Sequence, residues 1–204
     1  SIFLDRERVG RNRVCVFARE WITRTLAQRL SMYRLRADVT VDASTIKVIR
    51  GTGDAPEAAI ADPRHLALGW RHYGGQVSQP DVDWDAIRVE HVIPETGIEL
   101  TPDTYILEAG FERLNGVDFR KGCYVGQEVT ARMKHKTELR KGLQQVEIEG
   151  SAPVGAKITA DGKPVGQVFT QAEGKAIAYL RYDRAKGALQ AEEAELRWPS
   201  GATS

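Results

Sequence analysis

The pattern of the sequence changes near Gly142, and this change most constrains the fold. From Leu143 onward, the sequence consists of short β-type segments separated by turn-forming residues. These segments cover residues 144–148, 157–159, 165–169, 176–180 and 194–198. Asp161 and Gly162 form a typical hairpin turn between two of them. Short strands at regular intervals favour a small barrel or sandwich, so we predict a C-terminal β domain over residues 143–204.

Residues 1–142 combine helical and strand patterns, and we expect them to form a separate α+β domain. Apolar residues recur at helical spacing over residues 20–31, 84–93 and 103–114. The first of these helices is expected to bury one apolar stripe, which consists of Trp21, Ile22, Leu26 and Leu30. Alternating residues over 37–41 and 45–49 predict a hairpin. With 204 residues and 42% hydrophobic content, the chain can bury the cores of two such units.

The overall charge is balanced, but one segment is basic. Lys and Arg number 29 against 28 Asp and Glu, so no global field attracts nucleic acid or an anionic membrane. Seven Lys and Arg lie between Arg120 and Lys141, against Glu128 and Glu138. This run is either a solvated face or a landing site for an anionic ligand or partner. Aromatic residues are sparse there, which argues against nucleic-acid binding.

The cysteine content indicates a reducing compartment. Two cysteines in a chain of this length form no disulfide framework, and Cys15 lies among apolar residues, where a small buried hydrophobe is expected. No segment has the apolar length of a signal peptide or a membrane span. We therefore expect a soluble protein without a membrane partner.

Cys123 lies in a different setting, between two glycines and next to two cations. Neighbouring Lys and Arg favour the thiolate, which is the reactive and metal-binding form of cysteine. The glycines allow close approach of a ligand, and Gln127 and Glu128 open a helical run. This pattern predicts an exposed, presented thiol.

The segment around Cys123 resembles the signature of a known family, the folate-binding YgfZ-type iron–sulfur assembly proteins. These proteins are relatives of the glycine-cleavage T-protein, an aminomethyltransferase. The matching positions are Lys121, Gly122, Cys123, Tyr124, Gly126, Gln127 and Glu128. Supporting similarities are Tyr33–Val39, Asp62–Arg64 with Gly69–Arg71, Ile93–Gly97 and Asn115–Phe119. Together they cover residues 33–143, with a weaker likeness beyond.

The resemblance implies ferredoxin-like, T-protein-like α+β subdomains around a central pocket, followed by a small β-barrel. It also implies that tetrahydrofolate binds in this pocket. Glu90 corresponds to a glutamate that faces the pterin in T-proteins, although a solvent-facing helical carboxylate is an equal alternative. Trp70 is a candidate for stacking on the pterin or for the ordinary core. Lys121 and Arg132 are candidates for binding the anionic folate tail, or for a partner surface.

Members of this family carry a longer region before the Tyr33 segment, including, in aminomethyltransferases, the catalytic aspartate. The chain is therefore expected either to be incomplete at its N-terminus or to have a smaller pocket. Either expectation argues against true aminomethyl transfer. Tetrahydrofolate-dependent one-carbon transfer remains the enzymatic alternative to a non-catalytic assembly factor.

An iron–sulfur cluster needs about four ligands, and one presented thiol cannot hold it alone. We therefore predict that Cys123 shares a bridging cluster with a partner, such as an A-type iron–sulfur carrier or another assembly protein. The expected location is the cytoplasm of a bacterium or the mitochondrial matrix of a eukaryote. A third hypothesis is a hydrolase with Cys123 as nucleophile and His91 or His135 as base, but a lone histidine is more often structural.

Overall fold

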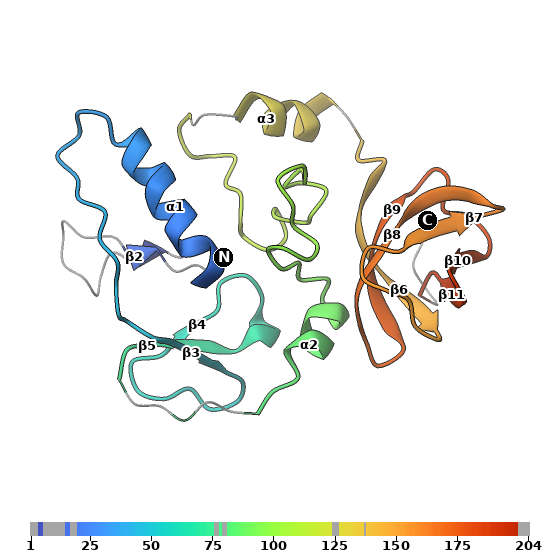
Figure 1. Cartoon of the computed structure of the whole chain (residues 1–204), viewed down its shortest axis with the longest axis horizontal. Helices are drawn as coiled ribbons and strands as arrows, with labels where there is room; N and C mark the ends of the chain where they lie inside the picture. The colour runs from blue at the N-terminus through green and yellow to red at the C-terminus, as the bar shows by residue number, and fades with distance from the viewer. Residues whose placement is uncertain are drawn as a thin grey trace.

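The computed structural model describes residues 4–5, 15–16, 20–75, 78, 81–123, 127–136 and 138–199. A mixed α/β region precedes a closed antiparallel barrel of six strands. Figure 1 shows the barrel at one end of the molecule and α1 at the other, with α2 and the segment that leads to α3 between them. The predicted α+β class with a C-terminal barrel is therefore confirmed. No helix among the described residues is long and apolar enough to cross a membrane.

The first helix forms, but its predicted buried stripe is wrong. This helix is α1, Glu20–Tyr33, and none of its residues is buried by the part of the chain that the structure describes. Trp21 keeps 61% of its surface exposed, and its ring approaches Gly97. The helical spacing of the apolar residues therefore predicts the helix correctly but not the burial of its apolar side chains. Two short strands, β1 Leu4–Asp5 and β2 Cys15–Val16, pair antiparallel before it. The Cys15 side chain lies outside the described residues.

The predicted hairpin over residues 37–49 is also wrong. Residues 39–47 form no strand, and β3, Val48–Gly51, pairs with β5, Trp70–Tyr73, instead. The short β4, Ile60–Ala61, completes a sheet of order β3-β5-β4. A two-stranded hairpin needs a further surface to pack on, whereas Val39 and Ile46 are both exposed.

Helix α2, Trp84–Glu90, is the element that connects the sheet with the barrel. Asp83 caps its N-terminus by accepting a hydrogen bond from the Ala86 amide at 2.9 Å. The helix ends three residues before the predicted end, because Val92 adopts a left-handed φ of 48°.

Residues 103–114 form a series of turns rather than the predicted helix. Gly110 has a φ of 74°, which a helix cannot accommodate, and the Phe111 amide donates to the Ile106 carbonyl at 3.0 Å. Leu107 and Leu114 are nevertheless buried. The apolar residues thus reach the core from irregular backbone. Asn115, with a φ of 55°, lies in the turn that ends the segment.

The barrel confirms the predicted strand pattern and adds one strand to it. Its strands are β6 Lys141–Glu149, β7 Lys157–Ala160, β8 Lys163–Ala172, β9 Lys175–Arg181, β10 Leu189–Ala191 and β11 Ala194–Arg197. The added strand is β10, which the sequence pattern does not predict and which closes the barrel by pairing with both β11 and β7. Asp161 and Gly162 both have positive φ, as a tight hairpin turn requires.

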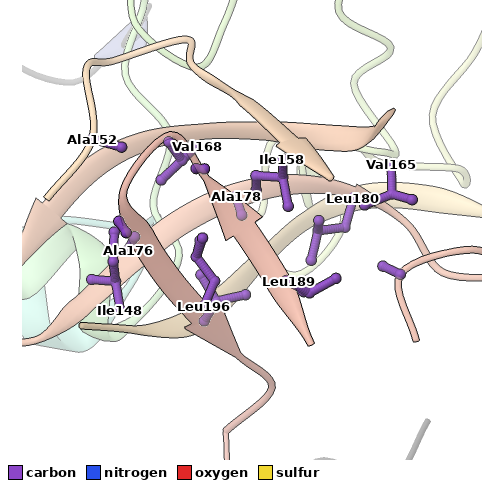
Figure 2. Packing of buried hydrophobic residues seen from close by; sticks show 14 of the residues in the cluster. Ile148, Ala152, Ile158, Val165, Val168, Ala176, Ala178, Leu180, Leu189 and Leu196 are labelled. Carbon is purple, nitrogen blue, oxygen red and sulfur yellow. The ribbon is translucent and has the colours of Figure 1, made fainter. Parts of the chain in front are cut away.

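Small and branched side chains fill the barrel interior (Figure 2). In β9, Ala176, Ala178 and Leu180 point inward and are fully buried. The alternate residues Ile177 and Tyr179 pack outward against Val89 of α2. Both faces of β9 are therefore covered, and the barrel is joined to the α/β region through a second core. The division of domains at residues 142 and 143 stays a prediction, with β6 beginning at Lys141.

A buried ion-pair cluster also links the two regions. The Arg88 guanidinium, on α2, lies 2.6 Å from the Glu99 carboxylate and donates to Thr170 Oγ1 on β8 at 3.1 Å. Glu99 in turn accepts hydrogen bonds from the Thr170 hydroxyl and, at 2.8 Å, from the Glu95 amide. All three side chains that form this cluster are buried, so α2 is fixed on the barrel by polar as well as apolar contacts.

Candidate functional site

Cys123 is an exposed free thiol, as the sequence predicts. It follows the exposed residues Lys121 and Gly122. A Cβ at Gly122 would meet no atom within 4 Å, so the backbone next to the thiol is open to approach. The motif residues Tyr124 and Gly126 lie outside the described residues. Helix α3, Gln127–Lys136, begins with the last two motif residues, Gln127 and Glu128.

Asp118 restrains the backbone just before Cys123. Its Oδ1 accepts a hydrogen bond from the Arg120 amide at 2.8 Å, and the same oxygen lies 3.6 Å from Arg120 Nε. The amide hydrogen bond, with the nearby charges of Arg120 and Lys121, holds the pKa of the Asp118 carboxyl below its ordinary value. Asp118 therefore stays ionised and forms an Asx turn directly before the thiol segment.

Phe119 and α3 form the other support of this segment. The Phe119 ring meets the His135 ring edge-on, with centroids 6.3 Å apart. Lys134 Nζ lies 5.6 Å from the centroid of the Phe119 ring and binds both carboxylate oxygens of Glu112, at 2.6 and 2.8 Å. This arrangement is not predicted by the sequence pattern, because a run of basic residues indicates a surface and does not reveal a distant carboxylate or ring as a partner.

The predicted cationic residues are exposed. The Arg120 side chain keeps 96% of its surface, and both Lys121 and Arg132 are exposed. Lys134 and Lys141, from the same run, instead form ion pairs with Glu112 and Glu108. The run is therefore partly structural and partly a charged surface.

Glu90 lies at the end of α2 and points toward the barrel. Its carboxylate contacts Lys175 Nζ at 2.5 Å and accepts from Gln145 Nε2 at 3.2 Å. The hydrogen bond from Lys175 holds the pKa of Glu90 below its ordinary value, so the group is a carboxylate at neutral pH. Half of the side chain remains exposed. The structure thus gives Glu90 an ion-pair partner that the sequence analysis did not foresee.

Trp70 is a buried residue of β5, with 5% of its surface exposed. Its Nε1 has no hydrogen-bond partner among the described residues, and neither has Nδ1 of His72. The two side chains lie on the same face of the sheet, because they are two positions apart on one strand. Unsatisfied buried polar atoms are uncommon in proteins, and a ligand or ordered water often accounts for them.

A small cleft lies on the opposite face of this sheet and beside α2. It is lined by Arg50, Arg64, Leu68, Arg88, Ile93, Pro94, Glu95 and Thr96. Its volume of about 30 Å³ is the space of about one water molecule. The cleft therefore has no room for a pterin in this structure. Two of the segments that carry the family resemblance, Asp62–Arg64 and Ile93–Gly97, contribute to it.

The polar residues beside this cleft are paired. Asp62 binds Arg64 at 2.8 Å and Arg71 at 2.7 Å. Burial raises the pKa of Asp62, but the hydrogen bonds and charges of the two arginines outweigh it, and the net effect is a lowered pKa. Asp62 is therefore an ionised anchor between the two arginines.

The two histidines nearest α2 contact each other. The rings of His65 and His91 lie 4.2 Å apart, and His65 Nδ1 accepts from the Ala67 amide at 3.2 Å to cap the 3-10 helix η1, Leu66–Leu68. Burial, together with the charges of His91 and Arg113, lowers the pKa of His65. His91 thus has a structural neighbour, and His135 lies against Phe119.

The candidate residues fall on three separate elements: the Cys123 segment with α3, the end of α2 and the strand β5. Among the residues that the structure describes, no group of three or more His, Cys, Asp or Glu side chains is placed to hold a metal ion. Any metal ligated by Cys123 therefore requires further ligands from elsewhere.

The mixed α/β region, the C-terminal barrel and the exposed Cys123 agree with the class of protein that the sequence resemblance implies, the relatives of the glycine-cleavage T-protein. Comparison with known sequences specifies the class further. Residues 140–202 match the family described as "CAF17, C-terminal beta-barrel domain". The mouse mitochondrial iron–sulfur cluster assembly factor IBA57 is 32% identical over 83% of this chain and 57% of its own length. The human protein of the same name is 30% identical over the same shares.

A putative chloroplastic transferase of Arabidopsis thaliana is 32% identical over 50% of this chain and 23% of its own length. The chain belongs to the IBA57/CAF17 family of YgfZ-type iron–sulfur cluster assembly factors, which confirms the resemblance stated above. It spans 57% of the length of its mouse and human relatives.

Proposed function

We propose that this chain acts in iron–sulfur cluster assembly by supplying the Cys123 sulfur as one ligand of a cluster that it shares with a partner protein. The observation that supports this function best is the exposed free thiol of Cys123 in a segment ordered by Asp118 and Phe119. The names of the mouse and human relatives describe assembly factors of this kind.

The chemistry follows from the number of ligands. Clusters of this type take about four protein ligands, most often cysteine thiolates, and the chain has two cysteines in total. Cys123 loses its proton to solvent when its sulfur binds iron, and the partner provides the other thiolates. The cluster is thus the cargo of the complex rather than a resident cofactor. An A-type iron–sulfur carrier, which presents cysteines of its own, is the proposed partner.

The test uses two single-cysteine variants of the same chain. The purified protein is mixed with a reduced A-type carrier, ferric iron and sulfide, and the heterocomplex is followed by size-exclusion chromatography and visible circular dichroism. We expect Cys123→Ser to abolish the cluster spectrum of the complex and Cys15→Ser to retain it. If Cys123→Ser forms the same complex with the same spectrum, the proposed function is wrong.

We also propose that tetrahydrofolate binds next to β5, with Trp70 and Glu90 as contacts and with Lys121 and Arg132 near its anionic tail. Support comes from the unsatisfied Nε1 of Trp70 and Nδ1 of His72, because a pterin offers both acceptors and donors to such atoms. Since Trp70 keeps only 5% of its surface exposed, folate binding requires this buried face of β5 to open.

Binding and turnover are distinguished in one set of measurements. We expect tetrahydrofolate to bind in calorimetry and Trp70→Phe, which removes the indole N–H donor and part of the aromatic surface, to weaken this binding. An assembly factor leaves the folate unchanged, whereas the alternative, an aminomethyltransferase-like enzyme, consumes it together with an aminomethyl donor. Turnover that depends on Glu90 would favour the enzyme. A reducing compartment, either the bacterial cytoplasm or the mitochondrial matrix, suits both functions, and neither needs nucleic acid or a membrane.

A further inference from the structure

We infer that Phe119, Lys134 and Glu112 form a brace that positions Cys123 for its partner, so that loosening the brace weakens the shared complex while the thiol stays accessible. This inference rests on the proposed function of Cys123. It assigns positioning roles to residues outside the 121–128 motif.

The thiol segment has little packing of its own. Residues 120–123 are all exposed, and no atom lies within 4 Å of where a Gly122 Cβ would be. Such a segment adopts many conformations unless residues at its ends restrain it. Asp118 restrains the first turn through the Arg120 amide. The next restraint is Phe119, four positions before Cys123.

Phe119 is half-buried and connects the start of the segment to the later part of α3. Its ring contacts the His135 ring, and Lys134 Nζ lies 5.6 Å from its centroid. An ammonium group at this distance from an aromatic centroid is attracted by the ring face. Because α3 begins at Gln127, just after the motif cysteine, these contacts tie together the two ends of the segment that presents the thiol.

Glu112 connects this pair to the rest of the molecule. Its two carboxylate oxygens bind Lys134 Nζ at 2.6 and 2.8 Å, which fixes the ammonium between the carboxylate and the ring. Glu112 belongs to the turn segment whose neighbours Phe111 and Leu114 pack in two apolar clusters. The Leu143 amide, at the start of the barrel, donates to Glu108 of the same segment at 2.8 Å. Through these contacts, the brace links the segment that carries Cys123 to the packed core and restrains its conformation.

A restrained segment loses less conformational freedom when a partner binds. Ordering loops and side chains at an interface opposes association, and a pre-ordered segment avoids part of that cost. The individual contacts are partly exposed, with 39% of the Lys134 side chain and 48% of Glu112 accessible. Their loss is therefore expected to leave the protein folded, which allows positioning to be separated from folding.

The test compares Lys134→Met and Phe119→Leu with the control Lys175→Met. Lys175 makes a comparable ion pair with Glu90, at 2.5 Å and with 38% and 51% of the two side chains accessible, but it lies on β9. We expect both brace variants to bind the A-type carrier about tenfold more weakly, a loss that corresponds to ~1.4 kcal/mol. Lys134→Arg is expected to restore binding, because a guanidinium can bind both Glu112 oxygens and stack on the ring.

Two measurements on the free protein separate positioning from general damage. In the brace variants, the rate of Cys123 alkylation by iodoacetamide is expected to stay within about twofold of the rate in the unsubstituted protein, because the thiol is already exposed. Hydrogen exchange at the Arg120 amide, which donates to Asp118, is expected to become faster in the brace variants and to remain unchanged in Lys175→Met. This second readout does not require the carrier.

The outcomes are distinct. Equal carrier binding by Lys134→Met and Lys175→Met, or unchanged exchange at the Arg120 amide, overturns the brace. If Cys123→Ser binds the carrier normally while the brace variants still accelerate exchange, the brace holds its segment but the proposed function of the thiol fails.

Discussion

Replacing Glu99 by alanine tests whether the buried ion-pair cluster holds α2 on the barrel. The Glu99 side chain is fully inaccessible and accepts hydrogen bonds from Arg88 at 2.6 Å, from the Glu95 amide at 2.8 Å and from the Thr170 hydroxyl. Removing one partner of a buried pair typically costs about 3–5 kcal/mol, because the other charge stays buried. Arg88 keeps Asp85 at 2.8 Å and Glu95 at 3.1 Å, so we expect the lower end, about 3 kcal/mol.

Urea unfolding measures this loss. With an m value of about 2 kcal/mol/M, Glu99→Ala is expected to lower the unfolding midpoint by about 1.5 M. Trp198 reports on the barrel, since its Nε1 donates to the Ala185 carbonyl at 2.7 Å. Circular dichroism reports on the whole chain.

The matched control is Glu195→Ala, which removes an exposed carboxylate that lies 3.3 Å from Arg197 on the barrel surface. A midpoint shift for Glu99→Ala no larger than the shift for this control would refute the reasoning. The stability of the α2 contact would then depend on the apolar cluster around Val89 and Ile177 alone.

Two further predictions concern stability. Gly166→Ala places a Cβ 2.1 Å from the Tyr179 carbonyl oxygen, so we expect the free energy of unfolding to fall by about 1–3 kcal/mol in thermal denaturation. The control Gly122→Ala has open space around its Cβ and should melt at nearly the temperature of the unmodified protein. Equal melting temperatures for the two would contradict the close approach of β8 and β9 at this position. The folded-state pKa of His65 lies below its ordinary value of 6.5, so the unfolded chain binds the proton more readily than the folded one. The stability that neutral His65 contributes is therefore fully present above pH 6.5. It is lost as the pH falls through the lowered folded-state pKa. The urea midpoint should therefore fall less between pH 7.5 and 5.5 in His65→Asn, which can still cap η1, than in the unmodified protein; equal slopes would count against this role.

The barrel was predictable because its information is local. Short β-type segments bounded by turn residues predict β6, β8 and β9, and Asp161-Gly162 marks a tight turn. Strand β10 has three residues, and its existence depends on pairing with β7, about 30 positions earlier in the chain. Such a strand has no local signal to find.

The helix expected over residues 103–114 failed for a different reason. Leu107, Phe111 and Leu114 are spaced as on a helix, but spacing indicates only that these side chains are buried together. Gly110, with its positive φ, interrupts any helix there, and glycine lowers helix stability at any position. The turns still deliver Leu107 and Leu114 to the core.

For the candidate site, the exposed thiol was predictable, but its supports were not. Glycines and cations around Cys123 indicate exposure from sequence alone. The partner of Lys134 is Glu112, 22 positions away, and that of Arg88 is Thr170, 82 positions away. Contacts at such separations depend on the finished fold, so a single sequence does not reveal them.

The ring of six strands has a consequence for how other proteins can be recruited. Every strand of the described barrel has a neighbour on both sides, so this barrel has no edge strand beside which an incoming peptide could add as a seventh strand. Recognition at this end of the molecule must depend on side chains and connecting turns. Evolution can therefore change the binding preferences of the ring by surface substitution without disturbing its hydrogen bonding.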